Sequence, residues 1–162
     1  DCLLSRGLGD VYKRQLSQNF EEQVAFDEVA DRILHMVGDV AASSGSVVAR
    51  REGSFGEVPA ETATALSLAT TELCQNAIEH SLDSSSGNVI VRPHRTDDAL
   101  VVDIVSDGKP LPEGFSLDNH RSSLGLSIVT TLMQDLGGTF TLEDNSDRVG
   151  TCARLVIPLQ RL

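Results

Sequence analysis

A segment from Pro59 to His80 dominates the sequence, because its spacing predicts one long helix with two different sides. Within it, Glu72, Asn76 and His80 follow one another at intervals of four, so a carboxylate, an amide and an imidazole lie along one stripe. A second side is apolar and consists of Leu66, Leu73, Ala77 and Ile78. Such a helix covers a core with its apolar side and leaves the polar stripe to a ligand or to solvent.

The polar stripe fits the ligand preferences of a hydrated magnesium ion. Magnesium prefers oxygen ligands, keeps several waters, and commonly takes one or two protein groups together with substrate phosphates. Asn76, with Glu72 one helical turn before it, supplies such a set. The alternative is that a helix of an acidic protein carries these polar residues on its wet side with no ligand at all.

The composition restricts the class of partner. With 162 residues the chain is long enough for one domain with a hydrophobic core. The formal net charge of −11 argues against a nucleic-acid partner and against a membrane-surface partner, since the phosphates of both repel an acidic surface. No apolar run is long enough to span a bilayer, and no secretory signal pattern opens the chain. Three cysteines without metal-ligand spacing indicate reduced thiols, so we expect a cytoplasmic protein.

The chain divides into a leader and one domain. Residues 1–15 follow no helical or strand period, and we expect a non-native or disordered leader there, with a short native tail as the alternative. Residues 16–162 form the expected domain. Its predicted helices begin at Phe26, Pro59 and Leu124, and its predicted strands are 46–55, 89–95, 99–106, 139–142 and 152–159.

The strand from Ala99 to Ser106 has one uncharged face, formed by Leu100, Val102, Ile104 and Ser106, and we expect that face to point into the core. Asp107 falls on the opposite face. The segment that follows, from Gly108 to Ser123, is rich in Pro, Gly, Asp and Ser, and a loop of that length in a compact domain is usually functional.

Three stretches after the long helix complete an ordered set of motifs. They are Ser106-Asp107-Gly108-Lys109-Pro110-Leu111-Pro112, then Leu124-Gly125-Leu126-Ser127-Ile128-Val129, and finally Gly150-Thr151. Together with the Glu72–His80 stripe, they resemble the N, G1, G2 and terminal Gly-Thr motifs of the GHKL ATP-binding fold, which gyrase, Hsp90, histidine kinases and MutL share. The resemblance covers the chain from about Phe26 to its C-terminus. It implies a two-layer α/β (α+β) sandwich, in which three helices cover one face of a mixed, mostly antiparallel sheet.

The resemblance also implies the site. Asn76 would bind Mg²⁺, Glu72 would order a metal-bound or attacking water, and His80 would reach the phosphates of ATP. The N-terminus of the helix at Leu124, Gly125 and Leu126 would donate N–H groups to phosphate oxygens. Further contacts with the nucleotide would come from the loop and the last strand, through Asp107, Gly108, Lys109, His120, Arg121 and Thr151.

This copy departs from the family pattern where the adenine base is expected. The G1 motif usually runs Asp-x-Gly-x-Gly, and its Asp accepts the adenine amino group. Here Ser106 occupies the Asp position and Pro110 the second glycine position, while Ser123 stands where the G2 motif commonly has glycine. Either Asp107 reaches adenine through a local shift, or Ser106 with a water substitutes and binding weakens.

Among the branches of this family, the chain most resembles the catalytic domain of soluble sensor histidine kinases of the HisKA_2 type. Such an enzyme moves the ATP γ-phosphate to a histidine on its own dimerisation domain and then to a response regulator. That phosphoacceptor domain is absent here, so we expect a fragment of a homodimeric kinase. The alternatives are an anti-sigma-factor serine kinase of the same fold, or a degenerate GHKL module that binds a partner without turnover.

Overall fold

The computed structural model describes residues 22–43, 45–82, 86–118 and 124–159, and these form two layers. One layer is a five-stranded sheet in the order β2-β4-β5-β7-β6. Its strands are β2 (Val47–Arg51), β4 (Gly87–Arg95), β5 (Ala99–Ser106), β6 (Thr139–Asp144) and β7 (Thr151–Pro158). β2 and β4 are parallel, and every other neighbouring pair is antiparallel.

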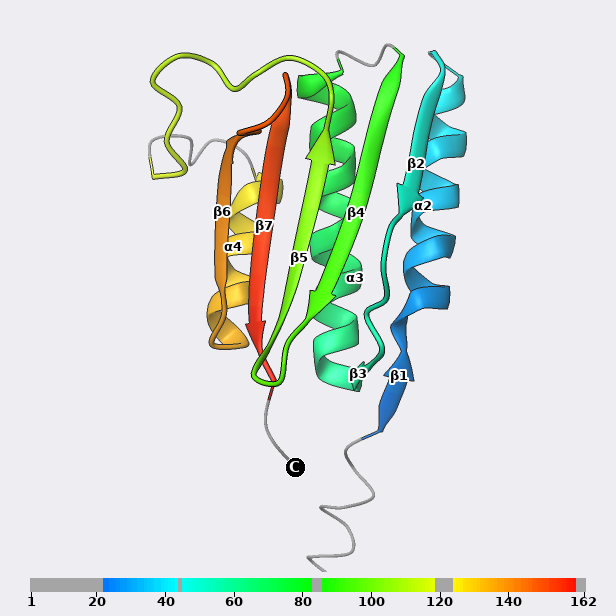
Figure 1. The fold of residues 1–162 in the computed structure, drawn as a ribbon, viewed down its shortest axis with the longest axis vertical. Coiled ribbons are helices and arrows are strands. Elements are labelled where there is room, and N and C mark those ends of the chain that lie inside the picture. The colour runs from blue at the N-terminus through cyan, green and yellow to red at the C-terminus, as the bar shows by residue number, and fades with distance from the viewer. Residues whose placement is uncertain (1–21, 44, 83–85, 119–123, 160–162) are drawn as a thin grey trace, which may run out of the picture.

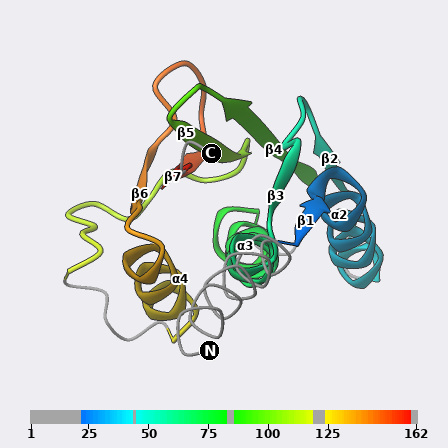
Figure 2. The ribbon, with the colours of Figure 1, turned by 90° about the horizontal axis from the view of Figure 1, so that it is seen from below.

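Helices α2 (Phe26–Ala42), α3 (Ala60–Asn76) and α4 (Leu124–Asp135) form the other layer. Figure 1 and the view from below in Figure 2 show all three against the same face of the sheet, with α3 in the middle. A separate two-stranded ribbon joins β1 (Gln23–Ala25) to β3 (Glu57–Pro59) at the starts of α2 and α3. The expected two-layer fold with a mixed, mostly antiparallel sheet is therefore confirmed.

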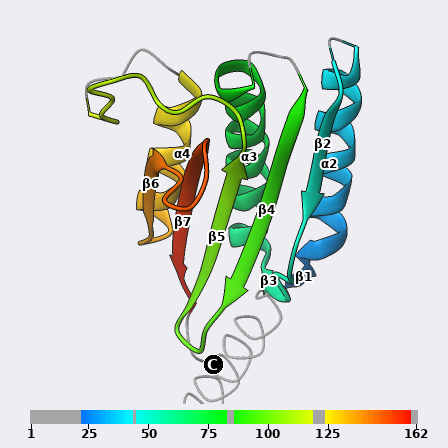
Figure 3. The same ribbon diagram turned by 45° about the horizontal axis from the view of Figure 1, so that its top comes forward.

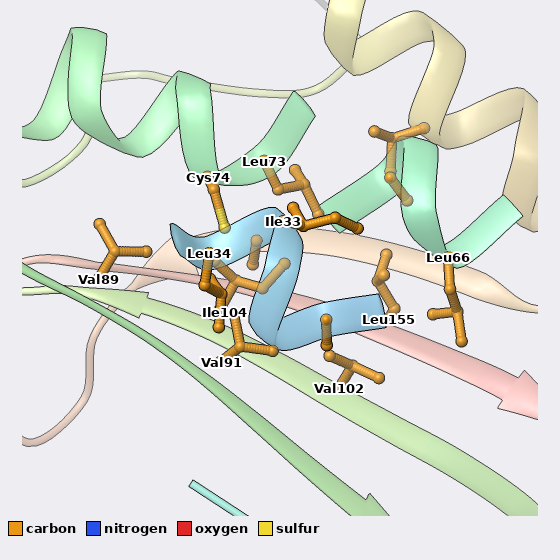
Figure 4. Close-up of a cluster of buried hydrophobic side chains, with 14 of the residues drawn as sticks. Ile33, Leu34, Leu66, Leu73, Cys74, Val89, Val91, Val102, Ile104 and Leu155 are labelled. Atoms are coloured by element: carbon orange, nitrogen blue, oxygen red, sulfur yellow. The ribbon is translucent and has the colours of Figure 1, made fainter. Parts of the chain in front are cut away.

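The inward face of β5 is the one that the sequence predicts. Leu100, Val102, Ile104 and Ser106 are at most 2% exposed. Their partners on β7 also point inward, because opposite residues of an antiparallel pair share a face. In register, Val102 lies opposite Leu155 and Ser106 lies opposite Thr151. In Figure 4 side chains of α2 and α3, among them Ile33, Leu34, Leu66 and Leu73, face side chains of the sheet, among them Val91, Val102 and Leu155.

The helix that carries the polar stripe changes its winding before it ends. The sequence predicts one α-helix as far as His80, but α3 ends at Asn76 and a π-helical turn, η1 (Ala77–Ser81), follows. The Leu82 N–H donates to the Ala77 carbonyl over 3.0 Å, which is the five-residue spacing of a π turn. His80 is therefore offset from the line that Glu72 and Asn76 define.

The strand predicted over 46–55 is shorter than expected, because β2 ends at Arg51 and Gly53 then takes a φ of 106°. Asp27, in the first turn of α2, holds the chain beyond that point. Its carboxylate accepts hydrogen bonds from Ser54 Oγ and from the Phe55 N–H, each over 2.7 Å. Phe55 is thereby held against Phe26, edge to face, with ring centroids 4.8 Å apart.

No helix among the described residues is both long and apolar enough to cross a membrane. The leader expected over residues 1–15 lies outside the described part of the chain.

Two glycines give opposite predictions for the same substitution. Gly38 lies inside α2, and a Cβ added there would have nothing within 4 Å. Because alanine has a higher helix propensity than glycine, Gly38→Ala should stabilise the fold by about 1 kcal/mol. Gly150→Ala has a φ of 130° and would press a Cβ onto the Ser106 carbonyl, so it should destabilise by about 2 kcal/mol or more. Urea unfolding of both variants at pH 7 measures the two signs, and equal effects would contradict this account of the turn at Gly150.

Asp27 predicts a dependence of stability on pH. Burial raises the pKa of Asp27. The hydrogen bonds from Ser54 and Phe55 and the charge of Arg51 lower it by more than burial raises it, so the net pKa lies below the ordinary value of 3.8. A lowered folded-state pKa stabilises the protein above about pH 4, and this contribution disappears as the pH falls through the folded pKa. Asp27→Asn should therefore lower the free energy of unfolding by about 1 kcal/mol at pH 7, a figure that already allows for the partial exposure of Asp27. The loss should become progressively smaller toward pH 3. The exposed neighbour Glu28→Gln is the control in urea unfolding, and a constant difference between wild type and Asp27→Asn across this range would contradict the assignment.

Candidate functional site

A cavity of about 260 Å³ opens where the end of α3 and η1 meet the loop after β5 and the start of β7. Its walls come from four parts of the chain that are far apart in sequence. They are lined by Asn76, Ala77, His80, Ser81, Lys109, Pro110, Leu111, Pro112, Leu142 and Thr151. Figure 3 shows the loop after β5 passing above the ends of β7 and β6, and the Leu111 N–H anchors it by donating to Asp144 Oδ1 over 2.7 Å.

The polar stripe of α3 runs from this cavity toward α4. Asn76 is half-buried and lines the cavity, and exposed His80 lines it from η1. Glu72 is also half-buried but faces Gly125 at the start of α4: a Cβ on Gly125 would lie 2.5 Å from Glu72 Oε2. Because only glycine leaves that space, the α4 N-terminus can approach the carboxylate of Glu72. The two neighbours of Gly125 point elsewhere: Leu124 is 77% exposed and Leu126 is packed in the core.

Three linked hydroxyls lie at the floor of the cavity: Ser81 and Thr151 line it, and Ser106 lies between them. Ser106 Oγ lies 2.7 Å from Ser81 Oγ and 2.9 Å from Thr151 Oγ1, and all three residues are buried. Ser81 also donates to the Lys109 carbonyl over 3.0 Å, and the Lys109 N–H donates back to the Ser81 carbonyl over 2.7 Å. Ser106, in the middle of this hydroxyl chain, is the residue that the resemblance places in the Asp position of the G1 motif.

Sequence reasoning missed Ser81, because a serine after a predicted helix carries no signal of its own. The signal lay in the glycines opposite it. A Cβ on Gly108 would collide with the Ser81 backbone, and one on Gly150 would collide with the Ser106 carbonyl. Both motif glycines therefore permit close backbone approach around the hydroxyl chain.

Asp107 faces away from this floor. Its carboxylate accepts a hydrogen bond from the Asn88 N–H over 2.8 Å and another from Asn88 Nδ2 over 2.7 Å. Burial raises the pKa of Asp107, but the donors of Asn88 and its own backbone N–H outweigh that effect and leave the pKa lowered. Asp107 does not contribute to the cavity wall. His120, Arg121 and Ser123 lie outside the described residues.

Neither described cysteine offers a reactive thiolate. Burial raises the pKa of the Cys74 thiol to about 12, and burial together with the nearby Asp103 carboxylate raises that of Cys152 to about 11. Among the described residues no group of three or more His, Cys, Asp or Glu side chains could hold a metal ion. A metal ion at this site would therefore be held by few protein side chains and would complete its shell with oxygens of water or of a bound small molecule.

Comparisons with known proteins agree with this geometry. Residues 61–161 match the family described as histidine kinase-, DNA gyrase B-, and HSP90-like ATPase. The sensor histidine kinase PdtaS of Mycobacterium tuberculosis is 42% identical over 149 residues, covering 90% of this chain and 29% of the relative. The blue-light-activated histidine kinase 2 of Erythrobacter litoralis is 30% identical over 135 residues, covering 82% of this chain and 37% of the relative. This chain thus spans about a third of the length of these curated relatives.

Solved structures share the fold. The histidine kinase domain of the Erythrobacter litoralis EL346 blue-light activated histidine kinase superposes with a TM-score of 0.65 at 29% identity, covering 83% of this chain and 59% of that one. The catalytic domain of histidine kinase ThkA gives a TM-score of 0.69 at 20% identity, covering 85% of this chain and 95% of that one, and supports the fold alone. The matched family, the order of the strands and the motifs gathered around the cavity agree, and the chain belongs to the histidine kinase-, DNA gyrase B- and HSP90-like ATPase family.

Proposed function

We propose that this domain binds Mg-ATP in the cavity and provides the γ-phosphate for histidine phosphorylation within a longer sensor histidine kinase. The observation that carries the proposal is the meeting of Asn76, the start of the loop after β5, and Thr151 around one cavity. These residues come from the N, G1 and terminal motifs, which are separated in the sequence. The kinase branch is supported by the relatives, which are named sensor histidine kinases.

The residues present fit a magnesium ion. Asn76 offers an amide oxygen at the cavity wall, and Glu72 offers a carboxylate one turn earlier beside the glycine gap of α4. Magnesium commonly takes one or two protein oxygens and completes its shell with waters and phosphates, so the absence of a larger acidic cluster among the described residues is consistent with it. Bound there, the ion would neutralise phosphate charge.

The remaining side chains have distinct tasks. Asn76 would hold the magnesium ion through its amide oxygen, and Glu72, close to the α4 N-terminus, would orient a metal-bound or attacking water. His80 and Lys109 line the cavity and would reach the phosphates from there, and Gly108 lets the loop approach the Ser81 backbone closely. The N–H groups at the start of α4 would donate to phosphate oxygens, which the helix dipole favours.

The rest of the reaction lies with parts of the longer protein. His80 lies at the nucleotide cavity and His35 is exposed on α2, so neither has the setting of a phosphoacceptor. We propose that the acceptor histidine belongs to the kinase's own dimerisation domain, that the whole protein is a cytoplasmic homodimer, and that a response regulator receives the phosphoryl group.

Asn76→Ala should abolish magnesium-dependent ATP binding, because it removes the oxygen at the cavity wall. Calorimetric titration of Mg-ATP into the 162-residue chain measures this. The matched control is Gln75→Ala, which removes the neighbouring exposed amide, absent from the cavity lining, and should leave the affinity unchanged. If folded wild-type protein fails to bind millimolar nucleotide, the domain is a degenerate module instead.

Glu72→Gln should separate binding from transfer. The amide keeps the size of the side chain beside Gly125 but lacks the charge that orients water, so ATP affinity should change little. Phosphohistidine formation by the full-length kinase should fall by about 10²-fold or more, the range for a positioned acid–base group. Acid-labile labelling from γ-labelled ATP follows the rate, and an unchanged rate would exclude this role for Glu72.

A further inference from the structure

Two exposed apolar side chains lie next to each other near the end of α2. Met36 is 53% exposed and Val40, one helical turn later, is 71% exposed. They border a hollow of about 290 Å³ between α2 and the end of α3, which we call the α2–η1 groove. It is lined by Met36, Val37, Val40, Ala41, Gln75, Ile78 and Glu79. As the described residues form them, this groove and the nucleotide cavity share no lining residue.

The shape and the apolar character of the groove suit a third helix. Val37, Ala41 and Ile78 are buried and form its floor, while Met36 and Val40 extend from its edge. Single exposed apolar residues are common, but here two adjacent ones border an apolar floor. An amphipathic helix fills a groove of this kind with side chains spaced three and four residues apart.

The charge around the groove is negative for two independent reasons. Figure 1 shows α2 and α3 running from the β1–β3 ribbon to the same end of the sheet, so both C-terminal ends lie at the groove. Neither helix has a basic residue in its last turn, so the partial negative charge of each helix end is not offset there. The exposed carboxylates of Asp39 and Glu79 add full charges at the same place.

The basic side chains nearby do not neutralise this end. Arg32 is exposed one helical turn before Met36, at the far side of the apolar pair. His35 Nε2 lies 3.3 Å from Asp39 Oδ2, but both side chains are well exposed to solvent, where such a pair is weak. His80 lines the nucleotide cavity instead. The groove therefore combines an apolar floor with an acidic border.

We propose that the α2–η1 groove docks a helix whose aliphatic stripe is flanked by Lys or Arg. The aliphatic stripe would cover Met36 and Val40, and the cations would face Asp39, Glu79 and the two helix ends. The same border repels the phosphates of a membrane surface or a nucleic acid. A second copy of this chain lacks the required charge, because α3 and α4 contain no Lys or Arg. The proposal does not depend on the nucleotide function.

Fluorescence anisotropy with three labelled peptides tests the proposal on the 162-residue chain. Each peptide has about 18 residues, a length at which a helix can form. The first carries a leucine stripe flanked by Lys, the second has Glu in place of every Lys, and the third keeps the Lys but has serine in place of leucine. The first should bind about tenfold more tightly than either other peptide at low salt, and its advantage over the second should narrow as salt screens the charges.

Variants of the apolar pair locate the bound peptide. Met36→Gln combined with Val40→Gln removes the exposed apolar surface without adding a charge, and should weaken binding of the first peptide by about tenfold or more. Leu68→Gln is the matched control. Leu68 is 50% exposed on α3 but does not line the groove, so its substitution should leave the affinity unchanged.

Charge reversal provides a readout that a purely structural effect would not produce. Glu79→Lys should weaken the Lys-flanked peptide severalfold and strengthen the Glu-flanked peptide. Asp135→Lys makes the same change of charge in the last turn of α4, outside the groove, and should shift both affinities much less. Thermal unfolding verifies that each variant is folded.

The remaining outcomes overturn the proposal. They are no binding of the first peptide, equal affinity for the Lys-flanked and Glu-flanked peptides, and binding that the Met36 and Val40 substitutions leave unchanged. Sedimentation equilibrium tests the other occupant: self-association that the double variant abolishes and Leu68→Gln retains would make the groove an interface between copies. Titration of Mg-ATP into the double variant should match wild type, so loss of peptide binding is distinguishable from loss of the nucleotide site.

Discussion

The antiparallel pairing of β5 with β7 is the constraint on which both the core and the site depend. Its register places Val102 opposite Leu155 and Ser106 opposite Thr151 on the face that the helices cover. A slip by one residue would turn Asp103 and Arg154 inward, and the cost of burying their charges makes that register unfavourable. The same pairing that buries the aliphatic side chains therefore brings two polar hydroxyls together at the end of the sheet. Core and site share one geometric origin.

Much of the fold could be predicted because it is written in local periodicity. The inward face of β5 follows from alternation, and the apolar side of α2 follows from helical spacing, with Phe26, Ile33 and Leu34 all buried as that spacing requires. Val40 lies on the same helix between buried Val37 and Ala41, yet its side chain is 71% exposed. Helical spacing alone contains no information on how wide a surface a neighbouring layer covers.

The features that escaped prediction depend on contacts between segments far apart in the chain. The bond from Ser54 to Asp27 spans 27 residues, and the contact of Ser81 with Ser106 spans 25. The placement of Glu72 beside Gly125 is likewise a matter of how α3 and α4 pack. The ordered motifs named several residues that line one cavity, among them Asn76, Lys109 and Thr151. Their individual partners required the tertiary structure, because each depends on a side chain that no local pattern marks.

The π turn at the end of α3 has a consequence for how such a site can be lost. A π turn amounts to one residue inserted into an α-helix. Removing any single residue of Ala77–Ser81 would restore ordinary winding, and each position beyond it would rotate by about 100° around the helix axis. Ser81 would then leave Ser106 without any change in the chemical identity of the cavity's remaining side chains. In related chains, the length of this segment is thus as informative about the contact between η1 and β5 as the residues within it, and an alignment that closes a one-residue gap here would conceal the difference.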